Sequence, residues 1–194
     1  MRSAKLLVFF VTWIVAIPAF AADTYKIDPA HTSITFSVRH LGINNVKGRF
    51  KDFAGTVVLE GKAIKEANGT IQAASIDTEV QQRDDHLRSP DFFDTDKHPT
   101  ITFKLKRAEQ SGVQAVLLAD FTMRGVTKEI RLPVKVTGPV KDQTGEIRIG
   151  LRAKAKLNRK DYGIAFSQAL ETGVAVVGEE VEIEIDAEAI KQAT

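Results

Sequence analysis

The segment from Arg83 to Pro99, RDDHLRSPDFFDTDKHP, is the part of the sequence richest in side chains that could do chemistry. It holds five aspartates, two histidines, three cations and two adjacent phenylalanines. Carboxylate and imidazole groups bind divalent metals and transfer protons. The first question is therefore whether this segment is a metal site, a catalytic site or the rim of a binding site.

A metal site would need carboxylates and imidazoles of this segment to reach the same point. Asp94, Asp96 and His98 lie at every second residue, so they would share one face of an extended chain. His86 and one aspartate of the pair Asp84–Asp85 would complete a ligand set suited to zinc, manganese or iron. This spacing matches no compact zinc pattern, however, and the sequence contains no cysteine. We therefore expect no metal site and no cofactor.

Surface ion pairs are a simpler interpretation of the same charged residues. The carboxylates of Asp84 and Asp85 would pair with Arg83, Arg88 or Lys97. Each exposed pair of this kind contributes about 1 kcal/mol or less. This interpretation gives the segment no chemical role of its own.

The rest of the sequence offers little evidence for catalytic residues. The G-x-S-x-G turn of serine hydrolases is absent. Asp161 and Glu171 would be a carboxylate pair for proton transfer, but Asp161 lies in NRKDYG, which is typical of a turn. His31 and His40 stand alone, as hydrogen-bonded structural histidines do. The sequence predicts no catalytic residue and no enzymatic activity.

The elements that must position these residues are β-strands, because apolar and polar residues alternate from Ser33 onward. The clearest segments are SITFSVRH (33–40), FAGTVVLE (53–60), ITFKLK (101–106), VQAVLLADFTM (113–123), EIRLPVKV (129–136), IRIGLRAKAKLN (147–158) and VEIEIDA (181–187). Each segment has one apolar face and one polar face that would be exposed to solvent. This pattern indicates antiparallel pairing, because parallel sheets are covered on both faces. The pattern predicts an all-β protein of about eight or nine long strands.

A few segments depart from this alternation. Pro133 implies a sheet edge or a bulge, and the opposite parity of Ile71 and Ile76 indicates a bulge between them. Helical character is scarce. We expect a helix of two or three turns within residues 79–89 and a second short helix at residues 167–173.

The apolar faces of these strands would be buried in a sandwich or in a closed barrel. A barrel of about eight strands has an interior filled by side chains or large enough for one small ligand. Gly55, Ala115, Ala119, Ala153 and Ala155 interrupt the apolar faces and would leave space for a cavity. The same small residues would also fit a barrel taper or a sandwich core, so the pattern alone leaves these alternatives open.

Residues 1–22 have the features of a secretory signal peptide. Two cations precede an apolar run over residues 6–17, and an A-x-A arrangement follows at residues 19–21. The run is too short for a spanning helix, although a retained anchor is the alternative. We expect one domain over residues 23–194, exported to the periplasm or secreted, without stable membrane insertion after cleavage.

The charge balance bears on the partners of that domain. The chain has 27 Lys and Arg against 25 Asp and Glu, and residues 1–22 contain Arg2, Lys5 and no acid. Residues 23–194 therefore carry 25 cations and 25 anions. This balance argues against nucleic acid or an anionic membrane as a partner. Without cysteine, the core must hold an exported fold with no disulfide.

Four segments together resemble the YceI family of proteins. They are IDPAHTSITFSVRHLGINNVKGRF (27–50), RDDHLRSPDFFDTDKHPTITFK (83–104), FTMRGVTKEIRLPV (121–134) and LNRKDYGI (157–164). Their order and spacing match the family over residues 25–190. The chain has Thr32 after His31, where the family usually has serine.

This resemblance implies a lipocalin-like antiparallel β-barrel of eight strands, closed partly by a helix. It implies an elongated apolar lumen that holds a long-chain isoprenoid or a similar lipid, a periplasmic or secreted protein, and a possible homodimer. It implies no catalytic activity. In such a barrel, Arg83, Asp84 and His86 would lie near the mouth, and Phe92 and Phe93 would fold over the interior as a lid.

The residues predicted to bind the ligand are mostly large and apolar. They are Phe36, Val38, Phe92, Phe93, Phe103, Phe121, Met123, Ile149, Leu151 and Phe166, with His86 at the rim and Arg49 and Arg83 for a polar head group. The predicted function is non-enzymatic binding or transport of that ligand. Two alternatives stay open: a structural or stress protein that acts through its dimer, and an enzyme acting on a lipid or quinone.

Overall fold

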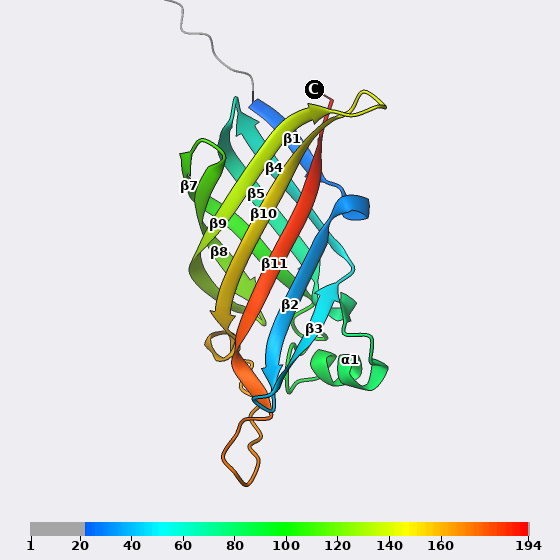
Figure 1. Cartoon of the computed structure of the whole chain (residues 1–194), viewed down its shortest axis with the longest axis vertical. Helices are drawn as coiled ribbons and strands as arrows, with labels where there is room; N and C mark the ends of the chain where they lie inside the picture. The colour runs from blue at the N-terminus through cyan, green and yellow to red at the C-terminus, as the bar shows by residue number, and fades with distance from the viewer. Residues whose placement is uncertain (1–21, 194) are drawn as a thin grey trace, which may run out of the picture.

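A computed structural model describes residues 22–193, and its strands form a closed antiparallel barrel of eight strands (Figure 1). In their order around the barrel, these strands are β1 (Ala22–Ile27), β4 (Phe53–Glu60), β5 (Ala63–Gln72), β7 (Thr100–Ser111), β8 (Gln114–Met123), β9 (Val126–Lys141), β10 (Ile147–Asn158) and β11 (Val177–Lys191). Pairing of β1 with β11 closes the ring. The fold predicted from the sequence is confirmed, and the sandwich alternative is excluded.

One strand of the barrel, β11, has two partners on the same edge. Its C-terminal residues 189–191 pair with β1, and its residues 177–186 pair with β2 (Ser33–His40). Between β1 and β2, the chain makes a single 3₁₀ turn, η1 (Pro29–His31), whose N-cap is Asp28. The break is bonded on both sides, because the Asp28 amide donates to the Glu188 carbonyl (2.9 Å) and the Glu188 amide donates to the Thr32 hydroxyl (3.2 Å). Thr32 thus supplies a hydroxyl, as the usual serine would.

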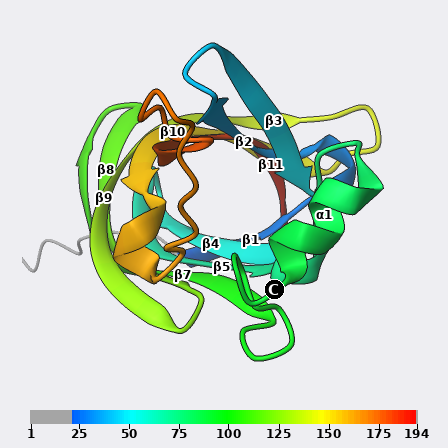
Figure 2. The same ribbon diagram turned by 90° about the horizontal axis from the view of Figure 1, so that it is seen from below.

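Beyond this break the sheet continues away from the ring. β2 pairs with β3 (Asn44–Phe50), and β3 pairs with the two-residue β6 (Ile76–Asp77). The barrel is therefore closed by hydrogen bonds at one end and widened at the other, where β2 and β3 diverge from β1. Viewed from the wide end, the strands surround a central space, with β3 and the helix α1 (Gln81–Arg88) on one side (Figure 2).

The remaining helical turns are short. η2 (Ala73–Ser75) joins β5 to β6, and η3 (Arg159–Tyr162) follows β10. The helix predicted within residues 79–89 is confirmed as α1. Among residues 22–193 no helix is long and apolar enough to cross a membrane. Nearly all of the predicted signal peptide lies outside the described residues.

Three local predictions have different outcomes. The helix expected at residues 167–173 is wrong: the Leu170 amide donates to the Val174 carbonyl, and a bridge joins Ala169 to Ala175, so the segment doubles back as a small hairpin. The parity change after Ile71 is produced by η2 and not by a bulge. The edge expected at Pro133 is confirmed, since the pairing of β9 with β10 ends at Val134.

The core fills the narrow end of the barrel. Tyr25, Leu59, Ile64, Ile149 and Ala189 are each 6% exposed or less and belong to one buried cluster. A second cluster lies at the wide end and contains the aromatic residues discussed below. Strand alternation places the strand residues of both clusters inside, and helical turns and loops supply others of the second cluster, such as Phe92 and Tyr162.

A close approach at Gly48 of β3 makes the wide end sensitive to substitution. A β-carbon there would lie 2.4 Å from the ζ carbon of Phe36 and 2.8 Å from the γ2 carbon of Thr78. The Phe36 ring therefore occupies the space of a side chain at position 48.

We expect Gly48→Ala to lower the free energy of unfolding by about 1–3 kcal/mol, because Phe36 must move. Urea denaturation measures this change. Gly69→Ala is the matched control, since its β-carbon would meet nothing closer than 3.8 Å and its backbone is not left-handed. Equal effects of the two substitutions would contradict the packing described here.

Candidate ligand-binding lumen

Two adjoining cavities occupy the interior of the barrel. The inner cavity has a volume of about 190 Å³, and the lid-side cavity, nearer the wide end, has a volume of about 130 Å³. The residues that line both are Ile34, Ile71, Ile101, Phe121, Ile183 and Ile185. Together the cavities reach the lower end of the range for ligand pockets, roughly 300–1,000 Å³.

The inner cavity exists because small residues stand where the ring would otherwise be filled. Gly55, Gly69, Ala153 and Ala155 all contribute to its wall. Larger side chains at the narrow end, among them Ile149, close the lumen there. Since no charged residue lines the inner cavity within residues 22–193, its wall suits hydrocarbon and not water.

The lid-side cavity is covered by the lid segment, which we define as residues 81–99. Leu87, Phe92 and Phe93 of this segment line the cavity. The Phe93 ring meets Phe50 edge to face, with centroids 5.9 Å apart. The lid thus presents these three apolar side chains to the lumen.

The lid segment meets the loop after η3 through three rings. Phe166 of that loop lies 4.8 Å from the Phe92 centroid, and His86 meets both rings edge to face at 5.0 and 5.2 Å. In Figure 2, α1 and η3 lie on opposite sides of the wide end, and the loop after η3 passes between them. These three rings form the aromatic closure.

The turn between β8 and β9 holds the lid in place. Arg124, at φ +49°, donates from Nη2 to the Pro90 carbonyl (2.8 Å) and from Nη1 to the Gly163 carbonyl. Gly125, at φ +73°, lies so close to His98 that a β-carbon would be 2.8 Å from the Cε1 atom of the imidazole. The lid and the η3 loop are therefore both tied to the same turn of the barrel.

Among residues 22–193, Arg159 is the one charged residue that lines either of the two cavities. It is 4% exposed and lines the lid-side cavity. Its guanidinium donates to the carbonyls of Gly178 (2.8 Å), Ile164 (2.7 Å) and Val177 (3.2 Å). Burial lowers its pKa, and Glu179 partly offsets this effect. An arginine nevertheless keeps its charge in proteins.

The apolar residues predicted to bind the ligand lie mostly at the cavities. The lid-side cavity is lined by Phe36, Val38, Phe92, Phe93 and Met123, the inner cavity by Phe103 and Leu151, and both cavities by Phe121. Two differ: Ile149 lies in the filled narrow end, and Phe166 packs on Phe92 in the aromatic closure. Their contact with a ligand stays a prediction.

The arginines predicted to bind a head group line neither cavity, so their contact with a ligand stays a prediction. Arg49 follows Gly48 and precedes the inward Phe50, so alternation directs it outward, where it pairs with Asp77 (3.1 Å). Arg83 donates to the Thr78 hydroxyl (2.7 Å) and to the Thr78 carbonyl (2.8 Å).

Three other charged or ionisable groups of the lid, Asp84, Asp85 and His86, have structural partners. Asp84, 5% exposed, accepts hydrogen bonds from the Thr78 amide and hydroxyl. Asp85 pairs with Arg88 (2.9 Å), and His86 contacts Asp91 (3.0 Å). The surface pairing predicted for Asp85 is confirmed, and that for Asp84 is wrong.

The sequence analysis missed Arg159, which it treated as part of a turn. One signal was available. Ala153, Ala155 and Leu157 face the lumen at every second residue, and the same parity reaches Arg159. Strand alternation continued past the end of β10 therefore indicates an inward side chain.

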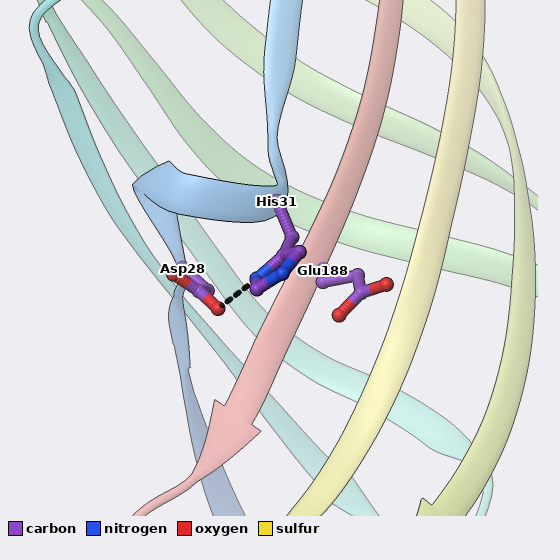
Figure 3. A group of neighbouring side chains, drawn as sticks. All are labelled: Asp28, His31 and Glu188. Atoms are coloured by element: carbon purple, nitrogen blue, oxygen red, sulfur yellow. Dashed lines mark hydrogen bonds and ion pairs between the residues drawn. The ribbon is translucent and has the colours of Figure 1, made fainter.

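One group of possible metal ligands occurs among residues 22–193: Asp28, His31 and Glu188 (Figure 3). It lies on the outer surface at the break between β1 and β2, far in sequence from the aspartates and histidines considered above. Asp28 contacts the His31 Nδ1 atom at 2.7 Å. The ligand atoms lie within 4.8 Å of one another.

The carboxylates of this group already pair with a cationic side chain of the protein, Arg148. The Nη1 atom of Arg148 lies 2.7 Å from Asp28 and 3.3 Å from Glu188. The same guanidinium pairs with Asp142 (2.7 Å) and Glu146 (2.8 Å). The cluster is thus an ion-pair network centred on Arg148, and its residues do not fit a metal site.

A larger hollow of about 850 Å³ lies on the outer face of β10, β11, β2 and β3. Its walls carry side chains of both charges, which pair with one another, as Lys154 does with Glu184 (2.9 Å) and Lys156 with Glu182 (3.1 Å). This surface is solvated and is not suited to an apolar ligand.

Fold and lumen together define a lipocalin-like barrel with an internal apolar site. Residues 25–189 match the model of the YceI-like domain family. The chain belongs to the YceI family.

Protein YceI of Escherichia coli O157:H7 is 37% identical over 178 residues, which cover 90% of each chain. Among solved structures, the YceI protein of Campylobacter jejuni has 32% identity and a TM-score of 0.70, covering 80% of this chain and 90% of its own. A polyisoprenoid-binding domain from Saccharophagus degradans, implicated in plant cell wall breakdown, shares the fold at 16% identity. Its TM-score is 0.68, with 87% of this chain and 98% of that domain covered.

From the ion pairs around Arg148 we predict that the free energy of unfolding decreases at low pH. Hydrogen bonds from His31 and Arg148 lower the pKa of Asp28 from 3.8 to about 2. Between these values the unfolded chain binds a proton at this carboxyl and the folded chain does not. The stabilisation by Asp28 is therefore full above about pH 4 and disappears as the pH falls through about 2.

We expect the unfolding free energy of the wild type to fall more steeply between pH 4 and 2 than that of Asp28→Asn, which lacks the titrating group. Urea denaturation at several pH values measures the two slopes. Asp52→Asn, at an exposed position, is the control and should follow the wild type. Parallel curves for wild type and Asp28→Asn would contradict the prediction.

Proposed function

We propose that this protein binds and carries a long-chain isoprenoid or a similar amphiphile in its lumen, without enzymatic activity. The observation that carries the proposal is the pair of adjoining apolar cavities inside a closed barrel. The lid segment and the aromatic closure cover these cavities at the wide end. The S. degradans domain supports it only in that the same fold is described there as binding a polyisoprenoid.

The energetics of such binding require little specific chemistry. Burial of apolar carbon contributes about 0.8 kcal/mol per methylene, hence roughly 4 kcal/mol gross for a five-carbon isoprene unit. Two or three units in the lumen would offset the entropic cost of association. An unfilled apolar cavity, in contrast, leaves its wall without packing contacts. The lumen therefore favours occupation by hydrocarbon.

The carrier proposal includes two further expectations. Export to the periplasm or to the exterior rests on the composition of residues 1–22, and it would place the protein where an isoprenoid must cross water. Assembly into a homodimer rests on the family resemblance. His31 contacts Asp28 and His86 contacts Asp91, and neither histidine lines a cavity of the lumen.

Filling the inner cavity should abolish binding. Ala153 is 7% exposed and lines this cavity, so Ala153→Phe places a ring where one isoprene unit would lie. We expect the affinity for geranylgeraniol, measured by isothermal titration calorimetry, to fall by at least about a hundredfold.

Lys154→Phe is the matched control for this substitution. It adds the same ring at the neighbouring residue, whose side chain is 77% exposed on the outer face. It should bind as the wild type does. Unchanged affinity in a folded Ala153→Phe protein would show that the ligand does not occupy the inner cavity.

Opening the aromatic closure should shorten the lifetime of the complex. Phe166→Ala removes the contacts of this ring with Phe92 and His86. We expect the dissociation rate of geranylgeraniol to rise roughly tenfold, in line with the loss of two aromatic contacts. Stopped-flow transfer to lipid vesicles measures this rate. Leu170→Ala, which changes an exposed residue of the same loop, should leave it unchanged, and an equal rise in both variants would contradict a closure by Phe166.

A further inference from the structure

Among the described residues, the side chains that line the lumen are uncharged except for one arginine. Of the residues that line either cavity within the described chain, Arg159 alone is ionised at neutral pH. It lies at the wide end, in the first turn after β10, and is 4% exposed. A ligand that enters from the wide end would therefore pass its side chain.

Arg159 differs from Arg148 and Arg88 in its partners, and from Arg83 and Arg124, which also lack a carboxylate partner, in lining a cavity. Arg148 contacts four carboxylates, and Arg88 contacts Asp85. Within residues 22–193, no carboxylate lies within 4.0 Å of the Arg159 guanidinium, which is bonded only to three backbone carbonyls. Carbonyl dipoles orient a cation but do not neutralise its charge, and Glu179 compensates the buried charge only in part.

The hydrogen-bonding capacity of Arg159 is only partly used. A guanidinium has five N–H donors, and the three carbonyl bonds employ one each from Nε, Nη1 and Nη2. Two donors therefore have no hydrogen-bond partner among the described residues, in a side chain that lines the lid-side cavity. Charge-assisted hydrogen bonds from arginine to phosphate or carboxylate oxygens are among the stronger polar contacts in proteins.

We propose that Arg159 binds the anionic head group, phosphate or carboxylate, of an amphiphile whose tail extends into the inner cavity. This inference rests on the proposed carrier function and deepens it, because it assigns the ligand a charge and a direction. The head group lies under the lid at the wide end. The tail passes Phe121 and Ile183, which line both cavities, toward Ala153.

A pair of ligands that differ only in the head group tests the proposal. Geranylgeranyl phosphate and geranylgeraniol are titrated into delipidated protein by isothermal titration calorimetry. The wild type should bind the phosphate at least about tenfold more tightly. Arg159→Gln should reduce this preference to about twofold or less, because it removes the charge that distinguishes the phosphate from the alcohol. Arg49→Gln, at an exposed arginine outside the lumen, is the matched control and should keep the full preference.

The outcomes separate this inference from the function on which it rests. If neither compound binds, the carrier function fails. If the wild type binds both equally, or if Arg159→Gln keeps the preference for phosphate, the carrier function stands and the head-group site is overturned. A parallel run with palmitate and hexadecanol distinguishes a carboxylate from a phosphate ligand by which anion gives the larger preference.

Arg159→Gln would fail to fold if the three carbonyl bonds are essential, so a measurement on the wild type completes the test. In protein labelled with ¹⁵N-arginine, the Arg159 Nε–H resonance, assigned by triple-resonance experiments on the wild type, should shift on addition of geranylgeranyl phosphate. It should shift much less with geranylgeraniol. Identical shifts with both compounds would overturn the proposal.

Discussion

The architecture depends on β11 bonding to two strands along one edge. Its last residues close the ring with β1, and its earlier residues bond to β2, which leads β3 and β6 away from the ring. The exchange of partners requires a break between β1 and β2, where backbone groups would otherwise be unpaired. Asp28 and Thr32 bond to Glu188 across that break, and the Arg148 network holds its carboxylates together.

This exchange explains why one end of the barrel is solid and the other hollow. Where β1 closes the ring, side chains such as Tyr25 and Ile149 fill the interior. Where β2 and β3 diverge, the ring widens beyond what the small residues on β4, β5 and β10 can fill. The lid segment and the loop after η3 then cover the wide end with aromatic rings. The β8–β9 turn holds both, because Arg124 donates to Pro90 and to Gly163.

Much of the barrel could be predicted from the sequence, because alternation shows which side chains face inward. It placed Phe36, Phe103, Phe121 and Leu151 on the face that proves to line the lumen. Sequence spacing could not show how far the ring is filled, so Ile149 was expected at a cavity. Strand parity continued past the end of β10 indicates an inward Arg159, but sequence spacing could not show that its guanidinium is buried. Nor could it show that Arg83, in the helix α1, lies away from both cavities, because the packing of the wide end decides this.

The central claim is that the lumen holds the hydrocarbon chain of an amphiphile. The most direct test is to purify the protein without detergent from its native host, extract it with organic solvent, and identify the extract by mass spectrometry. The account predicts one isoprenoid or similar lipid species at close to one molecule per chain. An extract without lipid, from a protein that also takes up no added isoprenoid, would contradict it and favour a structural role.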